Sequence, residues 1–187
     1  MSKSFFHPTA IIDEGCTVGE GTRIWHWCHI MKDVKIGDNC NIGEHAFIES
    51  GVVIGNGVKI KNNVAIYTGV VCEDDVFLGP NCVFTNVANP RSYIERKNEF
   101  KKTIIKKGAT IGANATIVCG NDIEEYAFVG AGSVVTKTVP AYTMVIGNPA
   151  KFYAHVCKCG VKLDKGLCCP ACGAQYIKDN NGVIREK

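Results

Sequence analysis

The stretch from Val34 to Ile66 reads VKIGDNCNIGEHAFIESGVVIGNGVKIKNNVAI, and every sixth residue from Ile36 onward is isoleucine. The series extends back to Ile12 and forward to Phe84, and no member is polar. After a break it resumes in a new phase at Ile105. A period of six with β-branched residues does not produce the apolar stripe of a long amphipathic helix, so repeated short strands are the better interpretation.

A second column lies two residues before each of these positions. Alternate residues of a strand face the same side, so both columns point into one interior. The members of the second column are mostly small or β-branched: Ala10, Cys16, Thr22, Cys28, Val34, Cys40, Ala46, Val52, Val58, Val64, Val70, Val76, Cys82, Thr103, Ala109, Ala115, Asn121, Ala127 and Ser133. We therefore expect the cysteines in these columns to be small apolar fillers of the core.

The position three before each aliphatic residue is rich in turn-forming residues. Glycine, asparagine and aspartate tolerate the positive φ of a tight corner, and His45 fits the same column. The others are Gly15, Gly21, Asp33, Asn39, Gly51, Gly57, Asn63, Gly69, Asp75, Asn81, Gly108, Asn114 and Gly132. Three strands and three corners close one triangular coil, and successive coils stack as a parallel solenoid.

From residue 10 to residue 139 these columns resemble those of the hexapeptide-repeat acyltransferase family. The resemblance implies an all-β, left-handed parallel β-helix, against the usual right-handed crossover preference. It also implies a homotrimer with active sites between subunits and acetyl-CoA as co-substrate. We expect the β-helix domain to span residues 1–154.

A polar segment interrupts the repeat between Phe84 and Ile105. A solenoid accommodates such an insertion as a loop directed outward, and we assign it to residues 85–104. In the family, a loop at this point reaches a neighbouring subunit and helps to build the active site. The alternative is a surface excursion without a function.

Two late coils and the end of the repeat resemble the family's CoA-binding segments. The coils contain Gly112, Gly130 and Ala131, whose small side chains would let the pantetheine arm approach the backbone. The ending Gly147-Asn148-Pro149-Ala150-Lys151 resembles the family's Gly-x-Pro-Ala-Lys segment, and Lys151 would meet a CoA phosphate. The alternative is that these glycines serve only the backbone conformation of the corners and bind no ligand.

The loop contains no histidine, although many relatives use a loop histidine as general base. A hydroxyl nucleophile needs such a base, whereas a partly unprotonated amine can attack a thioester once it is oriented. The sequence therefore favours N-acetylation. Two alternatives stay open: O-acetylation with a histidine base, and a non-catalytic scaffold. A zinc carbonic anhydrase on this fold would need histidine ligands that the late coils lack.

Four segments sharpen the resemblance to the 3-amino nucleotide-sugar N-acetyltransferases: RIWHWCHI from Arg23, KNNV from Lys61, GPNCVFTN from Gly79, and Asn89-Pro90-Arg91. In this group an asparagine at the position of Asn86 hydrogen-bonds the sugar amine. The resemblance implies UDP-2-acetamido-3-amino-2,3-dideoxy-glucuronate as substrate, for surface polysaccharide biosynthesis. A dTDP-amino sugar remains open, because enzymes for both nucleotides share the Phe-Thr-Asn pattern.

Four further side chains are candidate substrate contacts. Arg91 and Arg96 offer planar forks of donors for a carboxylate or a diphosphate. Tyr67 precedes Thr85 by 18 residues, hence by one coil, which places its ring about 4.8 Å below the loop root. His29 should face outward about 14 Å below that root, within reach of a nucleotide but not of the amine.

Five of the 11 cysteines fall between Cys157 and Cys172. The pairs Cys157–Cys159 and Cys169–Cys172, each followed by glycine, predict two knuckles that hold one structural zinc. The first pair is one residue shorter than the common spacing, and Cys168 is an alternative ligand. We expect residues 155–187, the cysteine tail, to be a zinc-ribbon-like unit, because so short a segment needs a metal to fold. The other interpretation is a disordered cysteine-rich tail.

Composition gives no reason to expect other partners. The 187 residues include 21 Lys plus Arg and 18 Asp plus Glu, a formal charge of +3, which does not indicate nucleic-acid binding. The N-terminus has no apolar run, and no apolar stretch is long enough to span a bilayer. We therefore expect a cytoplasmic protein without membrane insertion.

Overall fold

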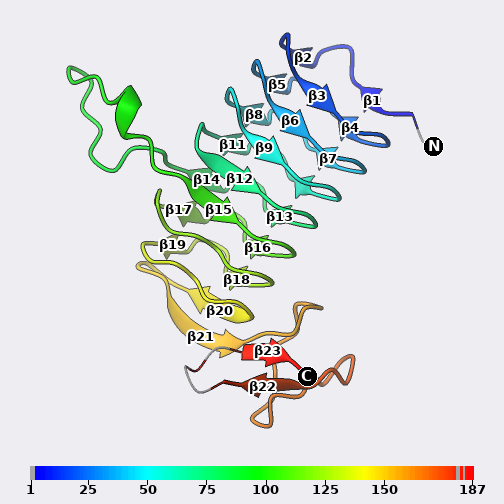
Figure 1. Cartoon of the computed structure of the whole chain (residues 1–187), viewed down its shortest axis with the longest axis vertical. Helices are drawn as coiled ribbons and strands as arrows, with labels where there is room; N and C mark the ends of the chain where they lie inside the picture. The colour runs from blue at the N-terminus through cyan, green and yellow to red at the C-terminus, as the bar shows by residue number, and fades with distance from the viewer. Residues whose placement is uncertain (1–2, 180–181, 183) are drawn as a thin grey trace.

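The computed structural model describes residues 3–179, 182 and 184–187 and shows an all-β, parallel solenoid followed by a small C-terminal unit (Figure 1). Within these residues the sole helical element is the 3-10 helix η1 (Lys97–Glu99). None of the helices in this part of the chain is long and apolar enough to cross a membrane. The predicted fold class is thus confirmed.

Three sheets run along the solenoid axis. The nine-stranded sheet contains β1 (Phe5–Phe6), β4 (Arg23–Ile24), β7 (Asn41–Ile42), β10 (Lys59–Ile60), β13 (Phe77–Leu78), β16 (Thr110–Ile111), β18 (Phe128–Val129), β20 (Thr143–Ile146) and β21 (Lys151–His155). The seven-stranded sheet contains β2 (Ile11–Ile12), β5 (His29–Ile30), β8 (Phe47–Ile48), β11 (Ala65–Ile66), β14 (Val83–Phe84), β17 (Thr116–Ile117) and β19 (Val134–Val135). The five-stranded sheet contains β3 (Thr17–Val18), β6 (Lys35–Ile36), β9 (Val53–Ile54), β12 (Val70–Cys72) and β15 (Thr103–Ile105).

Both predicted columns face the interior and form one continuous core. The aliphatic positions from Ile24 to Phe84 are all buried, whereas Ile12 and Val18 are half-buried because they lie in the first coil. Asn121 is half-buried as well, and its side-chain amide donates to the carbonyl of Val118 at 2.7 Å. A polar member of the column is therefore satisfied locally rather than packed.

The body cysteines pack in the core, as expected, and also complete its hydrogen bonds. The thiol of Cys28 donates to the carbonyl of Gly43 at 3.0 Å, and that of Cys40 to the carbonyl of Gly55 at 3.1 Å. The hydroxyl of Thr22 makes the equivalent bond to Gly37 at 2.7 Å. Burial raises the pKa of Cys82 to about 12, which keeps this thiol protonated and unreactive at neutral pH.

The predicted corners are confirmed at every position, since all thirteen turn formers named from the sequence, and His45, have positive φ. Three aromatic residues, Trp27, Tyr126 and Tyr142, also adopt positive φ, which the sequence did not indicate. One corner carries a ladder of side-chain caps: the amide N–H of Asp38 donates to Asn56 at 2.8 Å, and that of Asn56 donates to Asp74 at 2.7 Å.

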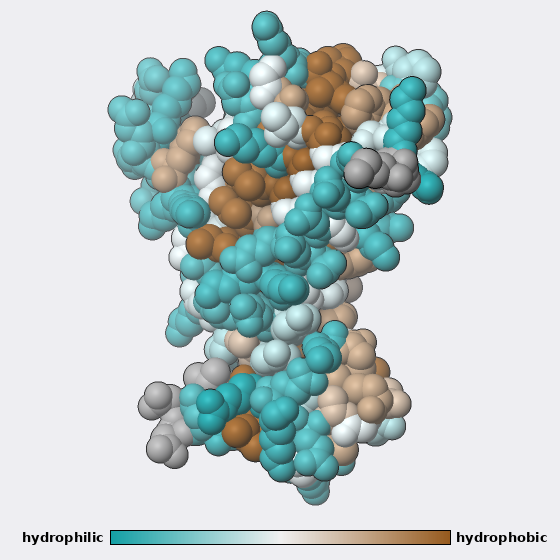
Figure 2. Space-filling model, turned by 45° about the vertical axis from the view of Figure 1, so that its right-hand side comes forward, coloured by the Kyte–Doolittle hydropathy of each residue, from teal (hydrophilic) through white to brown (hydrophobic). Residues whose placement is uncertain are grey.

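Exposed apolar side chains gather on the N-terminal coils, where the space-filling view shows a broad hydrophobic patch (Figure 2). The large apolar side chains exposed by more than a third in the described part of these coils are Phe5, Phe6, Ile11, Trp27, Val53 and Val83. These residues are spread over the three sheets, with Phe5 in the nine-stranded, Ile11 in the seven-stranded and Val53 in the five-stranded sheet. Exposed apolar patches of this kind mark contact sites more often than free surface.

Coil stacking predicts which glycines are required by packing. A Cβ on Gly79, whose φ is ordinary, would lie 2.6 Å from the backbone nitrogen of Ala113 and 2.8 Å from the carbonyl carbon of Gly112. We expect Gly79→Ala to lower the free energy of unfolding by about 1–3 kcal/mol, measured by urea denaturation at fixed protein concentration. Gly166→Ala is the matched control, because its Cβ would meet nothing closer than 3.4 Å. Equal losses in the two variants would contradict this account of stacking.

Candidate active site

The loop leaves the solenoid after β14 and returns at β15. Val70 of β12 pairs with Thr103 of β15, 33 residues later (103 − 70), whereas coils below the loop repeat every 18 residues (Lys59 to Phe77). The insertion therefore adds 15 residues to one coil. Figure 1 shows the loop projecting sideways from the prism, with η1 within it.

The root of the loop is held by one hydrogen bond between its two ends and one to the coil above it. The amide N–H of Lys101 donates to the carbonyl of Asn86 at 2.9 Å, which closes the neck. The hydroxyl of Thr85 accepts from the amide of Cys119 at 2.9 Å. The side-chain amide of half-buried Asn86 has no partner among the described residues, so it can bind a ligand from a fixed backbone position.

An aromatic ladder descends from this root along the outer face of the seven-stranded sheet. Tyr67 is half-buried, with its ring centroid 6.1 Å from that of Phe47, which lies 5.8 Å from the ring of His29. The Nε2 atom of His29 lies 3.3 Å from a carboxylate oxygen of Asp13. The sequence placed Tyr67 and His29 correctly in register, but the imidazole–carboxylate contact between adjacent coils was missed.

The register fixes the height of His29. It pairs with Phe47, Phe47 pairs with Ala65, and Ala65 pairs with Val83 beside the loop root. Three strand spacings amount to about 14 Å. Within one subunit, His29 cannot exchange a proton with a group held by Asn86.

The two loop arginines differ in their surroundings. Arg96 forms an ion pair with Glu99 at 2.8 Å, and its buried Nε atom has no hydrogen-bond partner in the part of the chain that the structure describes. Arg91 is exposed, and its Nη1 atom donates to the carbonyl of Pro90 at 3.0 Å. The guanidinium of Arg91 is thus the more available of the two for an anionic ligand.

The late-coil residues lie on one stacked corner. A Cβ on Gly112 would meet the backbone nitrogen of Ala131 at 2.5 Å, and one on Gly130 would meet Cγ2 of Ile146 at 2.7 Å. Packing between coils accounts for both glycines, so their presence does not itself indicate a ligand. Ala131 is exposed on the surface of the same corner.

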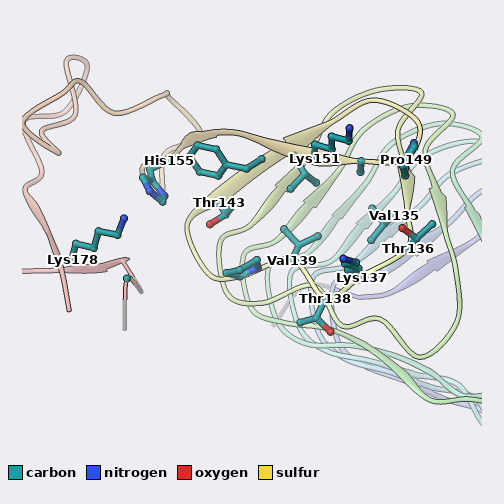
Figure 3. Close-up of a pocket in the computed structure, with 15 residues that line it drawn as sticks. Val135, Thr136, Lys137, Thr138, Val139, Thr143, Pro149, Lys151, His155 and Lys178 are labelled. Carbon is teal, nitrogen blue, oxygen red and sulfur yellow. The ribbon is translucent and has the colours of Figure 1, made fainter. Parts of the chain in front are cut away.

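Lys151 is exposed at the start of β21 and lines a cavity of about 660 Å³ at the C-terminal end of the solenoid. Figure 3 shows Val135 and Val139 at the end of the last coil, with Lys137 and Lys151 beside them. His155 and Lys178 approach this cavity from the cysteine tail. The tail therefore contributes to the surroundings of Lys151, which the sequence did not indicate.

The four predicted ligand cysteines converge in the tail. The Sγ atoms of Cys157, Cys159, Cys169 and Cys172 all lie within 4.8 Å of one another. Two of the separations are 3.5 and 3.6 Å, close to the roughly 3.8 Å between sulfurs of a tetrahedral zinc site with 2.3 Å bonds. The backbone N–H of Cys172 lowers the pKa of Cys169 to about 6. Cys168 lies outside this cluster, and the short first pair does not prevent convergence.

The tail has its own buried cluster and is attached to the solenoid by aromatic contacts. The cluster contains Leu163, Tyr176 and Ile184 beside Cys157 and Cys169. Its strands β22 (Tyr176–Lys178) and β23 (Ile184–Glu186) are antiparallel. The ring of Tyr176 lies 5.2 Å from that of Tyr142, which stacks on Tyr126 at 5.3 Å.

A triangular solenoid with a projecting loop and a late glycine corner is the architecture of the hexapeptide-repeat acetyltransferases. Two family models match: "Bacterial transferase hexapeptide (six repeats)" over residues 15–50, and "Hexapeptide repeat of succinyl-transferase" over residues 33–68 and 102–137. The chain is also 50% identical over 185 residues to dTDP-3-amino-3,6-dideoxy-alpha-D-galactopyranose 3-N-acetyltransferase from Aneurinibacillus thermoaerophilus. That alignment covers 97% of this chain and 94% of the relative. The chain therefore belongs to the hexapeptide-repeat acetyltransferase family and is an acetyltransferase.

Solved structures share the fold. The hexapeptide transferase family protein from Anaplasma phagocytophilum matches with a TM-score of 0.57 and 22% identity, over 82% of this chain and 80% of that one. A hexapeptide-repeat acetyltransferase from Vibrio cholerae, solved with acetyl coenzyme A, matches with a TM-score of 0.51 and 26% identity, over 62% of this chain and 70% of that one. The acetyltransferase domain of PglB from Neisseria gonorrhoeae matches with a TM-score of 0.56 and 19% identity. This chain covers 57% of that domain's length, and the match covers 80% of this chain.

Proposed function

We propose that this enzyme transfers the acetyl group of acetyl-CoA to the 3-amino group of a nucleotide-linked amino sugar, in the cytoplasm, for surface polysaccharide biosynthesis. The observation that carries the proposal is the side chain of Asn86, which has no hydrogen-bond partner among the described residues. It stands at the root of a loop without histidine, in a chain that is 50% identical to a 3-amino-sugar N-acetyltransferase. That relative favours a dTDP-linked 3-amino-3,6-dideoxy sugar. UDP-2-acetamido-3-amino-2,3-dideoxy-glucuronate is the second candidate, because the available guanidinium of Arg91 suits a uronate carboxylate.

The reaction requires orientation more than proton abstraction. The unprotonated amine attacks the thioester carbonyl carbon, the tetrahedral oxyanion collapses, the carbon–sulfur bond breaks, and CoA leaves as a thiolate that takes up the proton lost by nitrogen. Asn86 would accept a hydrogen bond from the amine and direct its lone pair at the carbonyl. A histidine base for O-acetylation finds no support in one subunit, because His29 lies about 14 Å below the root.

The two substrates would approach Asn86 from opposite ends of the solenoid. We assign the nucleotide sugar to the ladder below the loop, with Tyr67 against the sugar or base, His29 towards the nucleotide, and Arg91 and Arg96 from the loop. We assign acetyl-CoA to the coils above the loop, along the corner of Gly112, Gly130 and Ala131, with its nucleotide end at Lys151. The acetyl group then meets the amine at the loop root.

A direct assay tests this function. Purified enzyme should release free CoA from acetyl-CoA when supplied with a dTDP- or UDP-linked 3-amino sugar, and a thiol reagent or the mass of the acetylated sugar detects the product.

Asn86→Ala should lower kcat roughly ten- to a hundredfold, the cost of one oriented hydrogen bond, with little change in the Kd of CoA. Asn98→Ala, an exposed asparagine of the same loop, is the matched control and should behave as wild type.

His29→Ala separates this mechanism from catalysis by a histidine. We expect it to keep most of the wild-type kcat. A folded His29→Ala enzyme without activity, combined with a nearly normal Asn86→Ala enzyme, would reverse the assignment and indicate a base from a neighbouring subunit.

We also propose that the enzyme is a homotrimer. The exposed apolar side chains of the N-terminal coils support this proposal, as does the loop that projects sideways from its own solenoid. Light scattering at micromolar concentration should give three times the chain mass, and a monomer mass would contradict the proposal.

We further propose that residues 155–187 form a separate unit around one structural zinc ion held by Cys157, Cys159, Cys169 and Cys172. Four converging thiols and a small separate core support this assignment.

Elemental analysis of protein purified without chelator should give one zinc per chain. Cys172→Ala should lose the metal, whereas Cys168→Ala, the adjacent thiol outside the cluster, should retain it. Metal-free wild-type protein would refute the site.

A further inference from the structure

The cavity at the C-terminal end of the solenoid has a positive rim over an apolar floor. Its floor contains Val135, Val139 and Val145 from the last coil, and its rim contains Lys137, Lys151 and Lys178. No acidic residue lines it within the described part of the chain, and none of the three lysines takes part in a salt bridge there. A cavity of about 660 Å³ with this charge suits an anion that carries a partly apolar group.

His155 provides a second, independent observation. Its Nδ1 atom is buried and has no hydrogen-bond partner among the described residues. A buried polar atom without a partner costs free energy, and the positive potential around it is uncompensated. A negatively charged hydrogen-bonding ligand would relieve both.

The position of Lys178 depends on the cysteine tail. Lys178 ends β22, and β22 begins at Tyr176, whose hydroxyl donates to the Sγ atom of Cys157 at 3.2 Å. The amide of Lys158 in turn donates to that hydroxyl at 3.0 Å. The cysteine cluster therefore fixes the strand that presents Lys178 to the cavity (Figure 3).

We infer that the cysteine tail is part of the CoA-binding site: Lys178 and His155 form, with Lys151 and the last coil, a pocket for the phosphorylated nucleotide end of CoA. This inference rests on the proposed function, because it assumes that CoA runs along the late coils towards Lys151. Lys151 and Lys178 bind the phosphates, Nδ1 of His155 hydrogen-bonds a phosphate or ribose oxygen, and the valine floor and Phe152 accommodate the base. The tail then has a direct role in substrate binding, besides closing the end of the solenoid.

Calorimetric titration of the full-length, zinc-containing protein tests the inference. The ligands are CoA, 3′,5′-ADP, dTDP and inorganic phosphate. We expect Lys178→Ala to raise the Kd of CoA and of 3′,5′-ADP roughly tenfold, since one charge-assisted contact to phosphate is lost, and to leave the Kd of dTDP unchanged. Lys178→Arg should restore most of the affinity. Lys165→Ala, an exposed tail lysine outside the cavity, is the matched control and should bind like wild type.

Each other outcome has a distinct meaning. Unchanged Kd values for CoA and 3′,5′-ADP in Lys178→Ala would overturn the inference and leave the acetyltransferase function intact. Weakened dTDP binding with normal CoA binding would assign the pocket to the nucleotide sugar and overturn it as well. Inorganic phosphate that binds as tightly as 3′,5′-ADP would reject a nucleotide pocket. Wild-type protein that binds no CoA would instead count against the proposed function.

Discussion

Backbone stacking between successive coils is the constraint on which the rest of the structure depends. Each coil places its strands on those of the coil before it, and the corners approach so closely that a Cβ on Gly112 would lie 2.5 Å from the next backbone nitrogen. This requires glycine at the corners that approach most closely, such as those of Gly79 and Gly112. It also fixes the height of every side chain to multiples of the strand spacing. The loop root, the aromatic ladder and the late glycine corner therefore lie at fixed heights along the solenoid axis.

The loop is inserted without changing the register of the strands on either side of it. Fifteen additional residues enter one corner, yet Val70 still pairs with Thr103 and Val83 with Thr116. Hydrogen bonds from Cys119 to Thr85 and from Lys101 to Asn86 hold the root in place. A polar side chain can thus be presented outward from a solenoid whose interior is entirely used for packing. An amine substrate suits such a site, since it needs a fixed direction of approach more than a strong base.

The end of the solenoid poses a separate problem, because the last coil has no successor to cover it. The antiparallel strand β21 and the cysteine tail lie over that end, and the aromatic contacts of Tyr126, Tyr142 and Tyr176 join the two units. A thiol cluster gives the small tail a core that its length could not supply. The cap also leaves a lysine-rimmed cavity beside Lys151. In this way one element can stabilise the fold and shape a ligand site.

The sequence by itself determined the repeat, both core columns, the corners formed by glycine, asparagine, aspartate and His45, the interruption at the loop and the four converging cysteines. Each of these follows from spacing along the chain, because a period of six dictates which side chains face inward. Only the tertiary structure decided the contacts that join residues from different coils or units. These include the bonds from Cys28 and Cys40 to glycine carbonyls of the next coil, the contact of His29 with Asp13, and the ion pair that occupies Arg96. The cavity at the end of the solenoid is the clearest case, because no repeat relates the tail to the solenoid and only their packing makes Lys178 and Lys151 line the same cavity.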